Sequence, residues 1–112
     1  MRKGKIAAQT AHASLAAISK IRKCYGDNEM IVLDPRASAW FKGPFVKIVV
    51  SVDSEYKLKR LYHEAESRGM LCSLIKDAGR TEFNGVPTYT AVAIGPDELS
   101  KVDVLTGDLK LL

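Results

Sequence analysis

The sequence predicts an α/β fold in which a small mixed β-sheet carries helices on both faces, in three α/β/α layers. Three observations lead to it: an alanine-rich segment with helical periodicity at 5–22, a strand–helix–strand succession at 45–76, and a further strand-like run at 88–94. A strand, a helix and a strand joined by short connections form a βαβ unit, so we expect the strands at 45–52 and 72–76 to be parallel.

The bulk composition is that of an ordinary globular protein, and we expect one domain over residues 1–112. Hydrophobic residues make up 46% of the chain, so it can bury one core without disulfides. The net charge of +4 favours a polyanionic partner without proving one. Cys24 and Cys72 form no C-x-x-C pair, which predicts two reduced thiols. No apolar run approaches the roughly 20 residues of a membrane span.

The first predicted helix, 5–22, is rich in alanine, the strongest helix former. Its apolar positions recur at helical spacing, and we expect them to form one face: Ala7, Ala11, Leu15 and Ile18. Lys5, Gln9 and His12 fall at i, i+4 and i+7 and therefore share a second, polar stripe. The turn-forming residues 26–28 break the helix.

A short helix follows, with Asp34 as its N-cap and Pro35 at its first position. We expect Trp40 and Phe41 of this helix to pack inward. The run 45–52 is rich in valine and isoleucine, which is typical of a strand.

Ser54 is the predicted N-cap of the next helix, which runs to about residue 68 and stops at Gly69. Its predicted apolar face consists of Leu58, Leu61, Tyr62 and Ala65. The remaining predictions are, in order, a strand, a polar loop, a strand, a helix and a terminal segment that pairs or packs, at 72–76, 77–87, 88–94, 97–105 and 109–112.

Two segments have the composition of a functional site. Residues 4–13 place a lysine at a helix start beside small alanines, so a bulky anion can approach the free amides of the first turn. Residues 76–81 end a strand with Asp, Gly, Arg and Thr, where sites in open α/β sheets gather. Each pattern also has an ordinary explanation, since a polar stripe can be the solvated side of a helix and the second run consists of common loop residues.

These segments and two later ones resemble the motifs of a known family, the peptidyl-tRNA hydrolases of the archaeal and eukaryotic type, the second family with that activity. Residues 4–9 (GKIAAQ) with 12–13 (HA) are similar to its first-helix motif, and residues 73–81 (SLIKDAGRT) are similar to its central motif. Residues 91–96 (AVAIGP) and 106–112 (TGDLKLL) match its third and final blocks. The four blocks occur in the expected order and cover nearly the whole chain.

The chain departs from the family pattern in places. The family carries a β-strand before the step at Met1, so the resemblance predicts that this first strand is missing. The stretch 28–43 is more irregular than in the family. The usual Pro-Gly-Thr before the last strand reads Val-Pro-Thr at 86–88, which changes the loop but keeps the hydroxyl of Thr88. Asp108 replaces a histidine that is common in the final block, a change we do not expect to abolish the chemistry.

The resemblance implies hydrolysis of the ester that joins a peptide, or an N-blocked amino acid, to the terminal ribose of tRNA, without a metal or other cofactor. By resemblance, the catalytic residues are Lys5, Asp77, Thr81 and Thr88. Asp77 would orient or deprotonate a water, and Lys5 would stabilise negative charge on the attacked carbonyl. The alternative for these two residues is a salt bridge that only pins helix to sheet. Substrate contacts are expected from Gln9, His12, Lys3 and Arg80, with Arg2 and Lys76 as further phosphate contacts.

Partners and rival functions follow from the same resemblance. The family is usually homodimeric and cytoplasmic, with an organelle such as the mitochondrion open for a eukaryotic source, and we expect the tRNA as partner and no membrane. A basic group at 57–60 is interpreted as a solvated helix face. A basic RNA- or tRNA-binding or interaction module of the same fold, without catalysis, stays as the competing hypothesis. The sequence has no Gly-x-Ser-x-Gly elbow and no phosphate-binding loop, which disfavours a serine esterase and a nucleotide hydrolase.

Overall fold

The protein is described by a computed structural model that covers residues 1–80 and 83–112. In these residues, the helices are α1 Lys3–Ser19, α2 Pro35–Lys42, α3 Glu55–Ser67 and α4 Leu99–Thr106, and a 3₁₀ turn spans Phe83–Gly85. The strands are β1 Arg22–Tyr25, β2 Asn28–Ile31, β3 Val50–Ser51, β4 Cys72–Asp77, β5 Thr88–Ile94 and β6 Lys110–Leu111.

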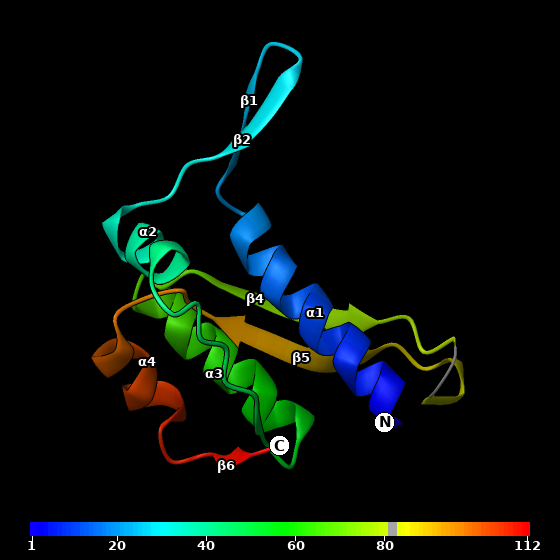
Figure 1. The fold of residues 1–112 in the computed structure, drawn as a ribbon. Coiled ribbons are helices and arrows are strands. Elements are labelled where there is room, and N and C mark those ends of the chain that lie inside the picture. Colours follow the sequence, from blue (N-terminus) through cyan, green and yellow to red (C-terminus); the bar gives the residue numbers. More distant parts are fainter. Residues whose placement is uncertain (81–82) are drawn as a thin grey trace.

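The centre of the fold is the antiparallel pair β4–β5, which has helices α1 and α3 on opposite faces (Figure 1). Successive side chains of a strand point to opposite faces. Ser73 accordingly donates a 2.6 Å hydrogen bond to the carbonyl of Ala13 in α1, while its neighbour Cys72 packs against Ala65 of α3 and the adjacent Met70. The predicted α/β fold with helices on both faces of the sheet is confirmed.

The predicted parallel βαβ unit is wrong. Every strand pair in the described residues is antiparallel, and β3 pairs with β6 instead of β4. Residues 45–49 belong to no strand, and only the last of them continues the pairing of β3 with the C-terminal segment. The carbonyl of Val46 accepts a hydrogen bond from the indole of Trp40, and the carbonyl of Val49 accepts one from the amide of Leu112. The prediction that the C-terminal segment pairs is confirmed by β6.

Of the apolar face predicted for α1, only Ile18 is buried. The buried residues of this helix are Gln9, Ala13, Ala17 and Ile18, whereas Ala7 and Ala11 are exposed and Leu15 is 67% exposed. Alanine at positions 13 and 17 lets the helix backbone approach β4 closely enough for the Ser73 hydroxyl to bind it. Close backbone approach, rather than the size of Leu15, therefore selects the buried face.

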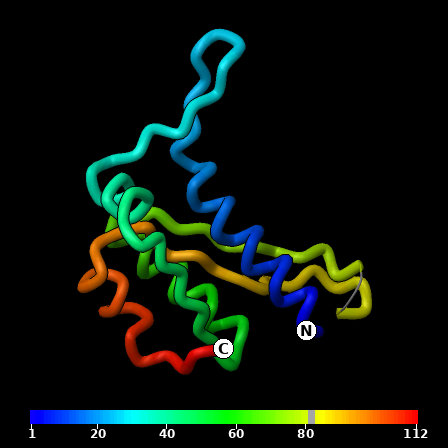
Figure 2. The backbone as a smooth tube through the Cα atoms, viewed as in Figure 1, coloured from blue at the N-terminus to red at the C-terminus, as the bar shows by residue number. Residues whose placement is uncertain are grey.

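The first helix ends at Ser19, earlier than predicted, and is followed by a hairpin that the sequence interpretation missed (Figure 2). The pairing of Tyr25 with Asn28 leaves Gly26 and Asp27 as a two-residue turn, with Gly26 at φ +62°. All eight residues of β1 and β2 are exposed. Because this arm projects from the body, the radius of gyration is 14.8 Å, against about 13 Å expected for a chain of this length.

Both predicted helix caps are confirmed. Asp34 accepts a hydrogen bond from the amide of Ala37 at 2.9 Å, and Ser54 accepts one from the amide of Lys57 at 3.1 Å. The predicted apolar face of α3 is also confirmed: Ala65 is buried, and Leu58, Leu61 and Tyr62 are half-buried.

The predicted inward packing of Trp40 and Phe41 is wrong. Their rings gather instead with Phe45 into a surface cluster with centroids 4.4 to 5.4 Å apart, and Phe41 stays 41% exposed. The three rings pack against one another, and this mutual contact covers part of their apolar surface without a place in the core. No helix in the described part of the chain is long and apolar enough to cross a membrane.

Candidate active site

The start of α1 meets the end of β4. The ammonium of Lys5 lies 2.7 Å from Oδ1 of Asp77, although 72 residues separate them in the chain. The two side chains are only 18% and 12% exposed, so the contact is largely shielded from water but still open to it. The structure thus brings together the two residues on which the sequence prediction of a site depends.

The second oxygen of Asp77 accepts a hydrogen bond from the amide of Gly79 at 2.9 Å. The hydrogen bond from Lys5, followed by that from Gly79, lowers the pKa of Asp77 below its ordinary value of 3.8, and partial burial opposes them without prevailing. Asp77 is therefore a carboxylate throughout the physiological pH range.

The geometry of this turn requires glycine at position 79. Gly79 has φ +82°, which residues with a side chain rarely adopt. A Cβ there would also lie within 2.8 Å of backbone atoms of Val86, and the Gly79 carbonyl accepts a hydrogen bond from Gly85. The loop thus closes on itself, and this closure aims the Gly79 amide at Asp77.

One turn further along α1, Gln9 is 5% exposed and accepts a 2.5 Å hydrogen bond from the hydroxyl of Thr90 in β5. Thr88, the predicted threonine of this strand, instead donates its hydroxyl to the carbonyl of Val86 in its own loop. Thr90 is thus a candidate residue that sequence reasoning missed. Alternation along a strand puts both threonines on one face, so periodicity favours neither over the other.

The remaining predicted residues lie around this pair. His12 is exposed, and its charge contributes to lowering the pKa of Asp77, which places it within electrostatic range of that carboxylate. Lys3 lies exposed in the first turn of α1, and Arg80 lies exposed directly after Gly79. Thr81 falls outside the described residues.

The arrangement supplies an ammonium, a carboxylate and a fixed amide at one partly open place. These are the groups that orient a water and stabilise an oxyanion in ester hydrolysis. The described residues contain no cluster of three or more His, Cys, Asp or Glu side chains that could hold a metal ion. Two hollows of the surface, one along α3 and one beside α2, lie away from Lys5 and Asp77.

Comparison with known proteins gives a consistent result over the full length. A family model described as peptidyl-tRNA hydrolase PTH2 matches residues 1–112. Proteins named peptidyl-tRNA hydrolase from Methanocaldococcus jannaschii, Haloquadratum walsbyi and Nanoarchaeum equitans are 42%, 40% and 38% identical to this chain. The matches cover 100%, 99% and 97% of this chain and 90%, 88% and 87% of those proteins.

Proposed function

The chain belongs to the peptidyl-tRNA hydrolase PTH2 family and hydrolyses peptidyl-tRNA to free tRNA, and from this premise we propose that Lys5 and Asp77 form the reaction centre. The single observation that carries the proposal is the 2.7 Å contact between them, made by two side chains that remain partly open to solvent. Water adds to the ester carbonyl, and the tetrahedral intermediate collapses with cleavage of the bond to the ribose oxygen. One proton of the water passes to that oxygen and the other to solvent, so the products are the peptide carboxylate and the ribose hydroxyl of tRNA.

Asp77 orients the water rather than deprotonating it in a separate step. A carboxylate whose pKa is lowered is a weak base, because its hydrogen bonds stabilise the charged form and make protonation less favourable. It still offers lone pairs beyond those taken by Lys5 and Gly79. Lys5 holds Asp77 ionised and stabilises the negative charge that develops on the carbonyl oxygen.

Gln9 and Thr90 lie next to Lys5 and Asp77 and support the site. Because Thr90 donates to the oxygen of the Gln9 side chain, the amide nitrogen of Gln9 is oriented as a donor toward the substrate. Thr90 therefore takes the supporting role that the family motif suggested for Thr88, whose hydroxyl is engaged with Val86. The proposal for Thr81, a hydroxyl that contacts the water or the substrate, rests on the family motif alone.

Basic residues at the rim bind the tRNA. Lys3 and Arg80 are exposed on the two segments that carry Lys5 and Asp77, so phosphates next to the ester can reach both. Such contacts position the nucleic acid without reading its bases. His12 contributes a further polar contact on the same helix.

A single-turnover assay with N-acetyl-aminoacyl-tRNA tests the catalytic roles. We expect Asp77→Asn to slow hydrolysis by about 100-fold or more, because the amide loses the charge that holds both Lys5 and the water. Binding of the substrate and the thermal melting curve should stay close to those of the wild type. Near-normal turnover by Asp77→Asn would contradict the role of Asp77. A wild-type chain that binds the substrate and leaves it intact would instead support a non-catalytic tRNA-binding module.

Three further properties complete the proposal. Hydrolysis proceeds without a metal, since the ammonium of Lys5 already supplies a positive charge beside Asp77, and activity should persist in EDTA.

The chain forms a homodimer through the cluster of Trp40, Phe41 and Phe45, and sedimentation of Phe41→Ser against the wild type tests this contact. The enzyme works in the cytoplasm, where tRNA is recycled for translation.

A further inference from the structure

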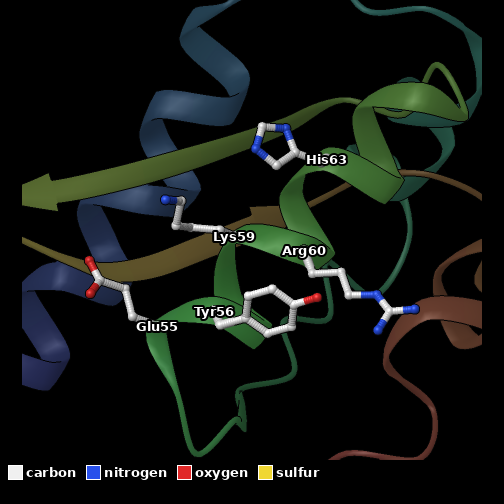
Figure 3. Close-up of a pocket in the computed structure, with 5 residues that line it drawn as sticks. All are labelled: Glu55, Tyr56, Lys59, Arg60 and His63. Carbon is white, nitrogen blue, oxygen red and sulfur yellow. The ribbon is translucent and has the colours of Figure 1, made fainter.

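The outer face of α3 carries an open hollow of about 590 Å³, on the side of the sheet opposite to α1. Glu55, Tyr56, Lys59, Arg60 and His63 line it (Figure 3). None of these residues touches the Lys5–Asp77 pair in the described contacts, and the sequence interpretation assigned this face to solvent. Its size is within the range of ligand sites, but its openness suits a surface contact better than an enclosed ligand.

Two lysines from different elements converge on one aromatic ring beside this hollow. The ammonium groups of Lys59 in α3 and Lys76 in β4 each lie 5.1 Å from the centroid of Tyr89 in β5. Lys76 and Tyr89 are register partners, and the next pair along the ladder is Asp77 with Thr88. The cluster therefore lies at the same end of the sheet as the ester site.

The cluster faces away from the ester site across the sheet. Tyr89 contacts α3, whereas its neighbour Thr90 contacts Gln9 of α1, as the alternation of a strand requires. A substrate that reaches around the end of the β4–β5 pair can therefore touch both faces at once.

The charges of this face are not balanced within the described residues. Lys59, Arg60 and Lys76 make no ion pair there. The carboxylate of Glu55 accepts a hydrogen bond from the amide of Tyr89 at 3.0 Å, which engages the nearby acid. Lys57, by contrast, is paired with Asp53 at 2.9 Å. Two ammonium groups beside Tyr89 and the guanidinium of Arg60 further along the lining of the hollow thus outnumber the one carboxylate of this face, Glu55, and an anion would balance them.

We propose that this face, formed by Lys59, Arg60, Lys76 and Tyr89, is a second docking surface for the tRNA and binds its sugar–phosphate backbone near the acceptor end. The proposal rests on the proposed function, because it takes the tRNA ester to lie at Lys5 and Asp77. Ammonium and guanidinium groups bind phosphates, and an aromatic ring accepts a base or ribose face without regard to sequence. A tRNA held on both faces of the sheet end cannot pivot about its ester.

The test compares two variants that remove the same charge. Lys59→Gln/Arg60→Gln removes two unpaired cations, and Lys57→Gln/Lys101→Gln removes two helix lysines that already have acidic partners, Asp53 and Glu98. With N-acetyl-aminoacyl-tRNA we expect the first variant to raise KM about 10-fold at unchanged kcat. The salt dependence of log KM should also flatten by about one to two units, since each phosphate contact contributes nearly one. The control should stay within about two-fold of the wild type.

A minimal substrate, the N-acetyl-aminoacyl ester of adenosine, separates this proposal from the proposed function. It lacks the backbone that the α3 face binds, so wild type and Lys59→Gln/Arg60→Gln should cleave it equally. If both variants bind tRNA alike, or if the α3 variant also loses activity on the minimal ester, the docking surface is refuted while the Lys5–Asp77 centre stands. Failure of the proposed function is a different outcome: Asp77→Asn would then hydrolyse N-acetyl-aminoacyl-tRNA at the wild-type rate.

Discussion

The contact between α1 and the β4–β5 pair differs sharply from the arm and loop that follow α1. In the first region, residues 60 to 81 positions apart in the chain are hydrogen-bonded: the hydroxyl of Ser73 donates to the backbone carbonyl of Ala13, and that of Thr90 donates to the side chain of Gln9. In the second, the ion pair of the β1–β2 hairpin, Arg22 with Glu29 at 3.4 Å, is internal to it. The hairpin thus depends on local contacts, whereas α1 is fixed to the sheet by long-range ones, as α2 is fixed to the segment before α4 by the ion pair of Arg36 with Asp97 at 3.2 Å.

The two regions differ in how accurately their side chains must be held. A reaction centre must hold its groups to within fractions of an ångström, which requires contacts that fix one element against another. An exposed hairpin needs only a turn and its own ladder, and an isolated hairpin is marginally stable at best. Substitutions in the first region should therefore change catalysis strongly, and changes in the second should have small effects.

The largest effect is expected from Lys5→Met. This change removes the charge beside the developing oxyanion, and loss of one such group lowers kcat by about 10² to 10³-fold. It also removes the main cause of the lowered pKa of Asp77, so the pKa of that carboxylate should rise. Because Asp77 stays ionised to lower pH when Lys5 is present, the residual activity of Lys5→Met should begin to decline at a higher pH than the activity of the wild type. Rates measured from pH 4 to 8 on both proteins test this.

The matched control is Lys5→Arg, which keeps the charge but presents it on a planar group. We expect it to recover part of the rate and most of the wild-type pH profile. If Lys5→Met were to keep the wild-type rate, the contact with Asp77 would be a fastening between α1 and β4 and nothing more.

A smaller loss is expected from Gly79→Ala. The new methyl group meets the backbone of Val86, and φ +82° strains any residue with a side chain. We expect the free energy of unfolding to fall by at least about 2 kcal/mol. The rate should also fall by about 10 to 100-fold, because the amide that holds Asp77 moves. Denaturant titration and single-turnover rates measure the two effects. Gly26→Ala, at φ +62° in the exposed arm with open space around its Cβ, is the control and should leave the rate unchanged.

The two threonines of β5, Thr88 and Thr90, differ in what their hydroxyls bind. Thr90→Val removes the donor to Gln9 and leaves a buried amide with one partner fewer, so kcat should fall about 10-fold. Thr88→Val removes only a contact within the loop and should cost less than about three-fold. Equal losses for the two variants would contradict our assignment of the supporting role to Thr90.

Much of the local structure could be predicted from the sequence because its causes are local. The caps Asp34 and Ser54 each bind an amide three residues ahead, so the residue type and its neighbours decide them. The turn at Gly26 and Asp27 has a local cause as well, since Gly-Asp between two short runs is a hairpin signal, although we interpret these residues from the sequence only as the end of the helix. The pairing of strands could not be read in this way. The valine-rich run at 45–49 has strand composition, but whether it gains a ladder depends on the distant C-terminal segment.

The candidate site shows the same division. The pair of Lys5 and Asp77 was predicted from the family motif, because neither periodicity nor composition connects two residues 72 positions apart. The burial of Gln9 was not predicted, since it depends on a hydroxyl supplied by β5 and on the small alanines that bring α1 close. From the sequence alone, polar residues on an alanine-rich helix are predicted to face solvent, because the strand that contacts them is not known.

The smallest effect is expected from shortening the arm. Arg22 and Ile31 are register partners, so replacing residues 23–30 by Asn-Gly joins them through a two-residue turn. Because the excised residues are all exposed, the free energy of unfolding should change by less than about 1 kcal/mol, and kcat/KM on N-acetyl-aminoacyl-tRNA by less than about two-fold. A rise in KM at constant kcat would show that the arm contacts the tRNA. A fall in kcat would connect the arm to the reaction centre, and the separation between a fixed catalytic region and an independent arm would then be wrong.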